Sequence, residues 1–329
     1  MTRPHMRHHP GRIGLFLGAL LPILAANGCT QAESTVQSQN QTASPPAAAI
    51  GGETVKIVTT FLPMYWFTKA VAGEKAQVDI LVPPGSEVHE YQATPAAVQA
   101  IAQANVLVKN GLGLEEFLKE TVKNAGNSSL KEIEASKGIK TLEETDHDHA
   151  EEKSDREHAG GNPHVWLDPS LAKQQVENIR DGLVAADPGN QTTYEANAAA
   201  YIQQLEGLDK EFQQRLQPYR GCTYVTFHDA YPYLAKRYQL KQVAVVQIPE
   251  DSLSPADVQK AVGAVKQYKV KALLGEPGTD NKLLQSLSQD LNLTLRPIDP
   301  LENGPQDPDH YFRAMRNNLQ TIEAACKES

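Results

Sequence analysis

The stretch from Gln191 to Gln217, QTTYEANAAAYIQQLEGLDKEFQQRLQ, decides the fold. Its apolar residues keep a spacing of three or four from end to end: Tyr194, Ala198, Tyr201, Leu205, Leu208, Phe212 and Leu216. This spacing predicts one amphipathic helix, which at ~1.5 Å per residue is about 40 Å long. A helix of this length can connect two domains as a stiff strut.

A shorter helix is predicted directly before the long one. Asp168 can cap its first turn and Pro169 suits its first position. Ala172, Val176, Ile179 and Leu183 then fall on one face, and the turn-forming residues 187–190 end the helix. Residues 169–217 therefore form a helical section with the long linking helix at its end.

Strands alternate with helices on both sides of this section. Before it, β-rich runs at 55–60, 76–82, 106–108 and 138–142 alternate with helical patterns at 66–73, 96–104 and 114–124. After it, strands are expected at 224–227, 243–246, 270–274 and 293–295, with helices at 231–238, 254–267, 280–290 and 309–326. This alternation predicts an α/β fold with two lobes, 53–168 and 218–329, each a small parallel sheet flanked by helices.

The N-terminus has the pattern of an export signal. Arg3, Arg7 and Arg12 are followed by an apolar run over 13–26, too short to cross a membrane, which predicts a signal peptide over 1–28. A small residue before Cys29 resembles the lipobox of bacterial lipoproteins. We therefore expect an exported protein anchored by lipid on Cys29, facing the periplasm or the cell exterior; ordinary secretion is the alternative.

Residues 29–52 are rich in Gln, Ser, Thr, Ala and Pro and predict a flexible tether that lets a folded body work above the membrane. The net charge of −9 argues against nucleic acid as a partner. With Cys29 lipidated, Cys222 and Cys326 remain in an oxidising compartment, and we expect a disulfide between them.

Three of the ten histidines lie in loops or at strand ends beside turn residues: His89, His164 and His228. Asp299 lies in a similar position near the C-terminus, whereas His310 is expected on the surface or at a helix cap. Ligands of open α/β sheets bind beyond the carboxyl ends of the strands, so these four side chains could meet around one ion. Three imidazoles and a carboxylate suit Zn²⁺. The alternative is that each histidine is an independent loop residue.

The order of the motifs resembles a known family, the solute-binding lipoproteins of bacterial ABC transporters for zinc and manganese, of the periplasmic high-affinity zinc-binding type. The matching segments are 61–65 (FLPMY), 85–95 (GSEVHEYQATP), 105–113 (NVLVKNGLG), 162–168 (NPHVWLD), 227–231 (FHDAY), 275–277 (GEP) and 298–301 (IDPL). The resemblance implies two α/β lobes joined by one long rigid helix, with the metal site in the cleft between the lobes. It also places His89, His164 and His228 on ligand positions of the family.

Two positions bear on the choice of metal. Manganese members of the family tend to have glutamate where this chain has His228, and an imidazole there favours zinc. Asp299 matches the family's aspartate, which in zinc members is either a ligand or is replaced by water. Some zinc members carry a glutamate just before the first histidine, but that position is Val88 here, so no extra ligand is expected from it.

The segment 143–161 is acidic and contains His147, His149 and His158. Its composition predicts a solvated loop, and histidine-rich tracts bind metal weakly. We expect these three histidines to form an auxiliary low-affinity site, separate from the tight one.

The resulting functional prediction is a receptor rather than an enzyme. It would bind Zn²⁺ as its transported ligand and deliver it, as a monomer, to an ABC permease and its ATPase. The alternatives are a manganese receptor of the same family, a secreted zinc-dependent hydrolase, although no HExxH motif is present, and a surface adhesin.

Overall fold

The computed structural model describes residues 54–142, 161–246, 254–276 and 281–328, all within one compact unit, Ala48–Ser329. The predicted signal peptide, Cys29 and the tether lie outside the described residues, as do His147, His149 and His158. In the described ranges, no helix is both long enough and apolar enough to cross a membrane.

The N-terminal lobe contains four parallel strands in the order β2-β1-β3-β4. These are β1 (Val55–Thr59), β2 (Ala76–Ile80), β3 (Val106–Lys109) and β4 (Lys131–Glu134). The helices between them are α1 (Leu62–Ala72), α2 (Pro95–Gln103) and α3 (Leu118–Ala125). Successive strand residues point to opposite faces, so Val58 and Leu107 pack with α2 and α3, while Ile57 and Val108 join the core that contains α1.

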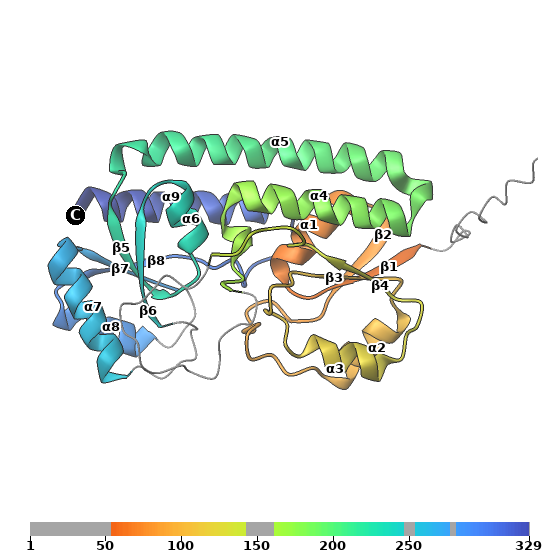
Figure 1. Ribbon diagram of the computed structural model, residues 1–329, viewed down its shortest axis with the longest axis horizontal. Helices are drawn as coiled ribbons and strands as arrows, with labels where there is room; N and C mark the ends of the chain where they lie inside the picture. Colours follow the sequence, from red (N-terminus) through yellow and green to blue (C-terminus); the bar gives the residue numbers. More distant parts are fainter. Residues whose placement is uncertain (1–53, 143–160, 247–253, 277–280, 329) are drawn as a thin grey trace, which may run out of the picture. The chain divides into compact units, whose positions relative to one another are not determined.

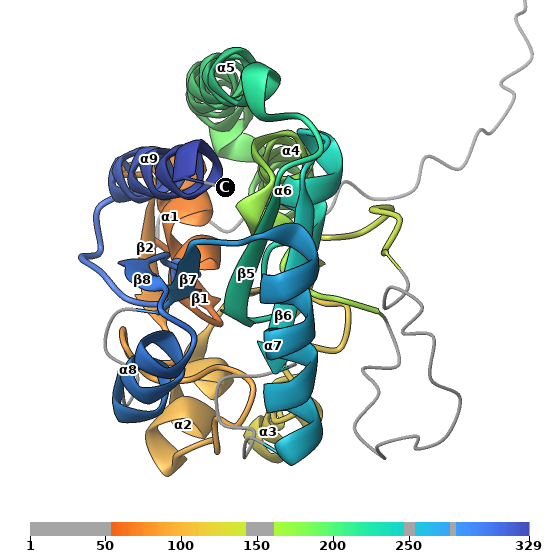
Figure 2. The same ribbon diagram turned by 90° about the vertical axis from the view of Figure 1, so that its left-hand side faces the viewer.

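The C-terminal lobe repeats this topology with parallel strands in the order β6-β5-β7-β8. Its elements are β5 (Thr223–His228), α6 (Pro232–Arg237), β6 (Lys241–Val246), α7 (Pro255–Tyr268), β7 (Ala272–Gly275), α8 (Asn281–Asp290), β8 (Thr294–Pro297) and α9 (His310–Glu328). Figure 2 shows α7 and α8 on one side of these strands and α6 and α9 on the other, in agreement with the two clusters of buried residues.

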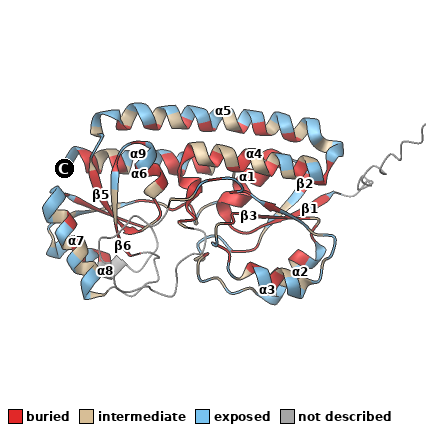
Figure 3. Ribbon diagram, in the orientation of Figure 1, coloured by how far each residue is buried: buried red, intermediate tan, exposed pale blue. Residues whose placement is uncertain are grey.

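The helical section consists of α4 (Pro169–Ala186) and α5 (Gln191–Leu216), which run side by side (Figure 1). The side chain of Asp168 accepts a hydrogen bond from Ser170 N at 2.8 Å and caps α4, as predicted. The buried residues of α5 are the seven apolar ones that defined the spacing, and its opposite face is exposed (Figure 3). The long linking helix is therefore confirmed.

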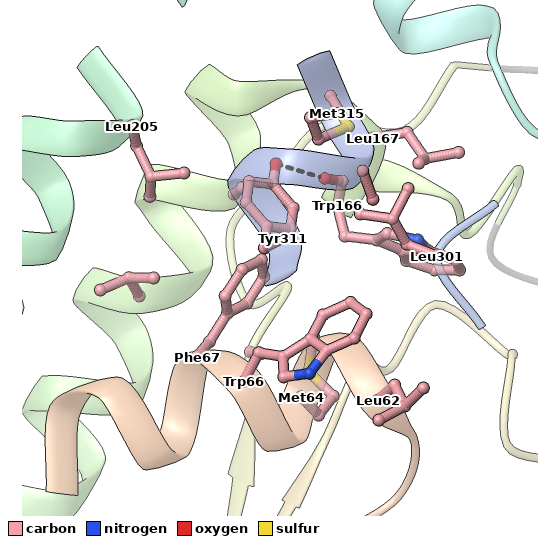
Figure 4. Packing of buried hydrophobic residues seen from close by; sticks show 14 of the residues in the cluster. Leu62, Met64, Trp66, Phe67, Trp166, Leu167, Leu205, Leu301, Tyr311 and Met315 are labelled. Carbon is pink, nitrogen blue, oxygen red and sulfur yellow. Dashed lines mark hydrogen bonds between the residues drawn. The ribbon is translucent and has the colours of Figure 1, made fainter. Parts of the chain in front are cut away.

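The two lobes also share one hydrophobic core. Phe67 of α1 packs edge-on against Tyr311 of α9 with the ring centroids 5.1 Å apart, and the Tyr311 hydroxyl donates to Trp166 O at 2.8 Å (Figure 4). Leu205 of α5 and Leu301, which follows β8, belong to the same buried cluster. The lobes are thus held together by continuous packing in addition to the strut.

One predicted strand is wrong. The segment 138–142 forms no strand: Gly138 has a φ of 78°, and Ile139 packs in a small cluster with Val165 and Tyr233. The fourth strand is instead β4, in which only Ile133 is buried. Helix α1 also begins four residues earlier than predicted, because Pro63 suits its first turn, and α3 begins four residues later.

The cysteines are paired as expected. A disulfide joins Cys222, just before β5, to Cys326 near the end of α9, with the Cα atoms 5.8 Å apart. It ties the chain's last helix to the start of the C-terminal sheet.

Candidate metal centre

His89 lies in the loop between β2 and α2 and is partly exposed. The loop is held against the segment that follows β8, because Gly85 N donates to Glu302 O at 3.1 Å. Gly85 has a φ of 80°, which favours glycine, and a Cβ there would lie 3.3 Å from Asn303 Oδ1. This contact brings the His89 loop of one lobe onto a loop of the other.

His164 lies directly before a 3₁₀ turn (Val165–Leu167) and is 2% exposed. Its Nδ1 is 2.9 Å from Asn162 Oδ1, and this oxygen also accepts from His164 N at 3.1 Å. Because the amide oxygen can only accept, Nδ1 carries the proton and Nε2 presents its lone pair. The preceding carbonyl, Pro163 O, accepts from Asn110 Nδ2 at 3.1 Å, which fixes the loop backbone.

His228 is the last residue of β5 and is 1% exposed. Its Nδ1 is 2.8 Å from Glu276 Oε1, whereas its Nε2 is buried and has no hydrogen-bond partner among the described residues. Burial lowers the pKa of this imidazole, but the charge and hydrogen bond of Glu276 outweigh burial and the pKa is raised. A carboxylate on one ring nitrogen with the other nitrogen left as a lone pair is the usual arrangement of a metal-binding histidine.

The three imidazoles converge. One nitrogen of each ring lies within 4.8 Å of one nitrogen of the other two, and the Nε2 atoms of His89 and His164 are 3.2 Å apart. Two nitrogens bound to one tetrahedral Zn²⁺ at ~2.0–2.1 Å would be about 3.3 Å apart. The spacing of these two rings therefore fits a shared zinc ion.

Asp299 does not join this group of converging ligand atoms. Its Oδ1 accepts from Leu301 N at 2.7 Å, and its backbone is held on both sides by the Asn318 side chain. Burial, with the charge of Glu276 added, raises the pKa of Asp299 to about 6. The carboxylate thus stabilises its own turn in this conformation.

Asn162 connects the two lobes at the site. Its Nδ2 donates to Asp229 O at 2.6 Å, and its own carbonyl accepts from the Tyr233 hydroxyl at 2.6 Å. The same side chain therefore orients His164 and binds the backbone of the residue after His228. Sequence reasoning did not identify this role, although Asn162 and Asp229 both lie within the motifs that flank the two histidines.

A second group of possible ligand atoms shares His89. One oxygen each of Glu87 and Glu302 and one nitrogen of His89 lie within 4.8 Å of one another. Sequence reasoning considered only the position directly before His89, which is Val88 and 1% exposed in the core. Glu87 lies one residue further from the histidine, and its partner Glu302 comes from the other lobe.

A comparison with known proteins agrees with this architecture. The family model described as "Zinc-uptake complex component A periplasmic" matches residues 57–325. The zinc-binding lipoprotein AdcA of Streptococcus pneumoniae is 35% identical over 279 residues, which is 82% of this chain but 55% of that protein. The chain thus spans about half the length of this relative.

One further relative and one domain structure are matched along nearly their whole length. The high-affinity zinc uptake system protein ZnuA of Bacillus subtilis is 31% identical over 318 residues, covering 94% of this chain and 96% of that protein. The crystal structure of the Zn(II)-bound ZnuA-like domain of S. pneumoniae AdcA is 32% identical, with a TM-score of 0.70 over 84% of this chain and 100% of that domain.

Proposed function

The chain belongs to the family of periplasmic zinc-uptake components, and from this premise we propose that it is an extracytoplasmic receptor that captures Zn²⁺ for uptake. The observation that carries the proposal is the convergence of His89, His164 and His228 from the two lobes. Each of the two buried rings is oriented by a neighbouring oxygen, from Asn162 or from Glu276. The site therefore needs little rearrangement to bind an ion.

His89, His164 and His228 are the proposed metal ligands, with Asp299 as the fourth. Asp299 would have to turn its carboxylate away from Leu301 N to reach the ion. If it keeps that hydrogen bond, water completes the coordination instead. Because bound imidazoles must be deprotonated, zinc capture weakens as the pH falls through the range in which histidine titrates.

The proposed partners are an ABC permease and its ATPase, which receive the ion. The receptor acts as a monomer, held at the membrane by lipid on Cys29, and His147, His149 and His158 provide weak auxiliary binding. Replacing Cys29 with alanine should move the protein from the membrane fraction to the soluble extracytoplasmic fraction. Retention of Cys29→Ala in the membrane would contradict the anchor.

The geometry argues against the hydrolase alternative. A zinc hydrolase needs a base beside the open coordination position, where it activates water. Glu276 is the carboxylate in contact with His228, and it is engaged with Nδ1, whereas Nε2 has no hydrogen-bond partner among the described residues. Glu276 thus orients a ligand, as expected for a site that binds rather than reacts.

A competition titration of the mature protein with Zn²⁺ and Mn²⁺ tests the proposed function. We expect tight binding of one Zn²⁺ ion and much weaker binding of Mn²⁺. In His228→Glu, the added oxygen ligand should shift this preference towards Mn²⁺. A wild-type protein that prefers Mn²⁺ would support the manganese receptor instead.

A further inference from the structure

We propose that Glu115 is a positioning residue of the zinc site, which acts on His164 through the two residues that flank it, Pro163 and Val165. The inference rests on the proposed function, because it concerns how the site is held in the shape that binds the ion. Glu115 lies between β3 and α3 and is 9% exposed. Among the described residues it belongs to neither group of possible ligand atoms, so any effect on zinc is indirect.

The carboxyl group of Glu115 holds the backbone that follows β3. Its Oε1 accepts from Asn110 N at 2.6 Å and from Thr60 Oγ1 at 2.8 Å, and its Oε2 accepts from Gly111 N at 3.0 Å. Both oxygens face backbone donors, whereas a side-chain amide would turn its own N–H group towards one of them. A carboxyl group is costly to bury without such partners, so this position requires an acceptor rather than a side chain that only fills the core.

The first path from Glu115 runs through Asn110 to the residue before His164. Asn110 is fully buried, and its Nδ2 donates to Pro163 O at 3.1 Å. Its Oδ1 accepts from Gln175 Nε2 at 2.8 Å, so the side chain is held in one orientation. Because Glu115 fixes the backbone of Asn110, a change at Glu115 moves the side chain that holds Pro163.

The second path runs through a strained loop to the residue after His164. Gly111 and Leu112 both have positive φ, of 88° and 58°. Leucine rarely adopts this conformation, which persists only where the surroundings fix it. The carboxyl group of Glu115 holds Gly111 N, and Leu112 packs against the small cluster that contains Val165. The loop thus contacts both neighbours of His164, and Glu115 fixes the loop.

The same carboxyl group also reaches the loop that carries His89, over a longer path. Thr60 is fully buried and donates to Glu115 through its hydroxyl, while its carbonyl accepts from Val82 N at 2.9 Å. Val82 lies at the start of the loop between β2 and α2. The path to His89 is longer than the two paths to His164, so we expect His164 to respond more strongly.

The zinc affinity of Glu115→Gln, measured by calorimetry with a competing chelator, tests the proposal. We expect a loss of at least fivefold, because the amide cannot accept from both backbone N–H groups. Glu116→Gln is the matched control, since it removes the same charge from the next, exposed position and should change the affinity less than twofold. Ile101→Ala is the control for stability: it removes a fully buried side chain of the same lobe, in a cluster that contains neither Leu112 nor Val165, and should also change the affinity less than twofold.

A double-mutant test shows whether Glu115 acts on His164 and not only on the stability of the lobe. In the His164→Ala background, Glu115→Gln should lower zinc affinity less than twofold further, because the ligand that it positions is absent. In the His228→Ala background, the loss of at least fivefold should remain. In this test all proteins lack the three histidines of the acidic segment, which are replaced as His147→Gln, His149→Gln and His158→Gln.

Equal losses in the two backgrounds, or a loss in the wild-type background no larger than that of Ile101→Ala, would overturn the positioning role and leave the proposed function intact. If urea unfolding shows that Glu115→Gln does not fold, Thr60→Val replaces it in the same tests. This variant removes one hydrogen bond to the carboxyl group, so we expect a two- to fivefold loss, and a loss no larger than that of Ile101→Ala would overturn the proposal. Failure of the wild type to bind zinc would overturn the proposed function instead.

Discussion

The two lobes have the same strand order, but different residues follow equivalent strands. The buried residues just after β1, β3 and β4 in the N-terminal lobe are neutral, whereas the end of β5 and the segments just after β7 and β8 in the C-terminal lobe carry buried ionisable residues. The buried residues compared are Thr60, Asn110 and Ser136 in the first lobe, and His228, Glu276 and the largely buried Asp299 in the second. The edge of the C-terminal sheet thus presents side chains that could bind a metal, whereas the corresponding buried residues of the N-terminal sheet are not metal ligands.

The neutral edge of the N-terminal lobe supports loops instead. Asn110 donates to Pro163 O and accepts from Ser136 Oγ and Gln175 Nε2, at 3.1, 3.1 and 2.8 Å. These bonds fix the backbone that presents His164. The comparison teaches that one lobe supplies a histidine on a strand, while the other supplies two histidines on loops. A buried polar network holds the loop of His164, and a backbone contact with the segment after β8 holds the loop of His89.

Removing the strand-borne histidine should have the largest effect. We expect His228→Ala to lower zinc affinity at least about 1000-fold, or about 4 kcal/mol. This exceeds the 10–100-fold cost that is typical of losing a residue that only supports a ligand. Calorimetric titration with a competing chelator measures it.

His310→Ala is the control for this variant, because His310 packs against Trp66 with the ring centroids 5.3 Å apart and belongs to neither ligand group. It should change zinc affinity less than twofold. Near-wild-type zinc binding by His228→Ala would show that the site does not depend on the strand-borne ligand.

The sequence predicts the parts of the fold that have strong periodicity. The long helix and the βα alternation follow from the spacing of apolar residues, and the structure reproduces both. Strand β4 was misplaced because Lys131, Glu132 and Glu134 are exposed and only Ile133 is buried, so the edge strand has little apolar pattern. The segment 138–142 has two large apolar residues, Ile139 and Leu142, but they pack in a small cluster with Val165 and with Tyr233 of the C-terminal lobe without forming a strand.

The candidate site was predicted only in part for a different reason. His89, His164 and His228 could be selected because each lies beside turn residues in a recognisable motif. The group of Glu87 with Glu302 could not be selected, because it depends on a contact between loops at opposite ends of the chain. The roles of Asn162 and Tyr233 likewise arise from contacts between the lobes, which no local pattern encodes.

The stability of the folded protein should depend on pH through a buried carboxylate at the junction between the lobes. Asp168, at the start of α4, is 5% exposed and lies 3.4 Å from Arg237 of the C-terminal lobe. Burial raises its pKa to about 6 from 3.8, despite the hydrogen bond from Ser170 and the charge of Arg237. The folded state therefore binds more protons than the unfolded state between these two values, so stability falls as the pH rises from about 4 to about 6.

Asp168→Asn removes this contribution while keeping a residue that can cap the helix. Between about pH 4 and about pH 6, the free energy of unfolding of the metal-free wild type should therefore fall more than that of the variant. The expected difference is up to about 3 kcal/mol, because one pKa unit corresponds to ~1.36 kcal/mol. Urea unfolding at pH 4, 5, 6 and 7 measures the difference. Parallel pH profiles for the two proteins would mean that folding does not raise the pKa of Asp168.

Glu276, which follows β7 as Asn110 follows β3, provides a smaller test of the comparison. Glu276→Gln keeps an oxygen near His228 Nδ1 but removes the charge, so we expect zinc affinity to fall about 10–100-fold. Glu120→Gln, an exposed substitution in α3, should leave zinc affinity unchanged. An effect of Glu276→Gln below twofold would mean that the carboxylate does not support the ligand.

The smallest effect is expected from deleting 143–158, which directly precedes the loop-borne His164. The contacts that orient His164 come from Asn162 and Asn110, both outside this segment. The described residues on either side of the segment are already close, because a Cβ on Gly161 would lie 3.1 Å from Leu142 O. Residues 159–160 can therefore close the gap without moving His164, and calorimetry should give a zinc affinity within about threefold of the wild type. A complete loss of zinc binding would show that the contacts of Asn162 and Asn110 are not enough to hold the loop that carries His164.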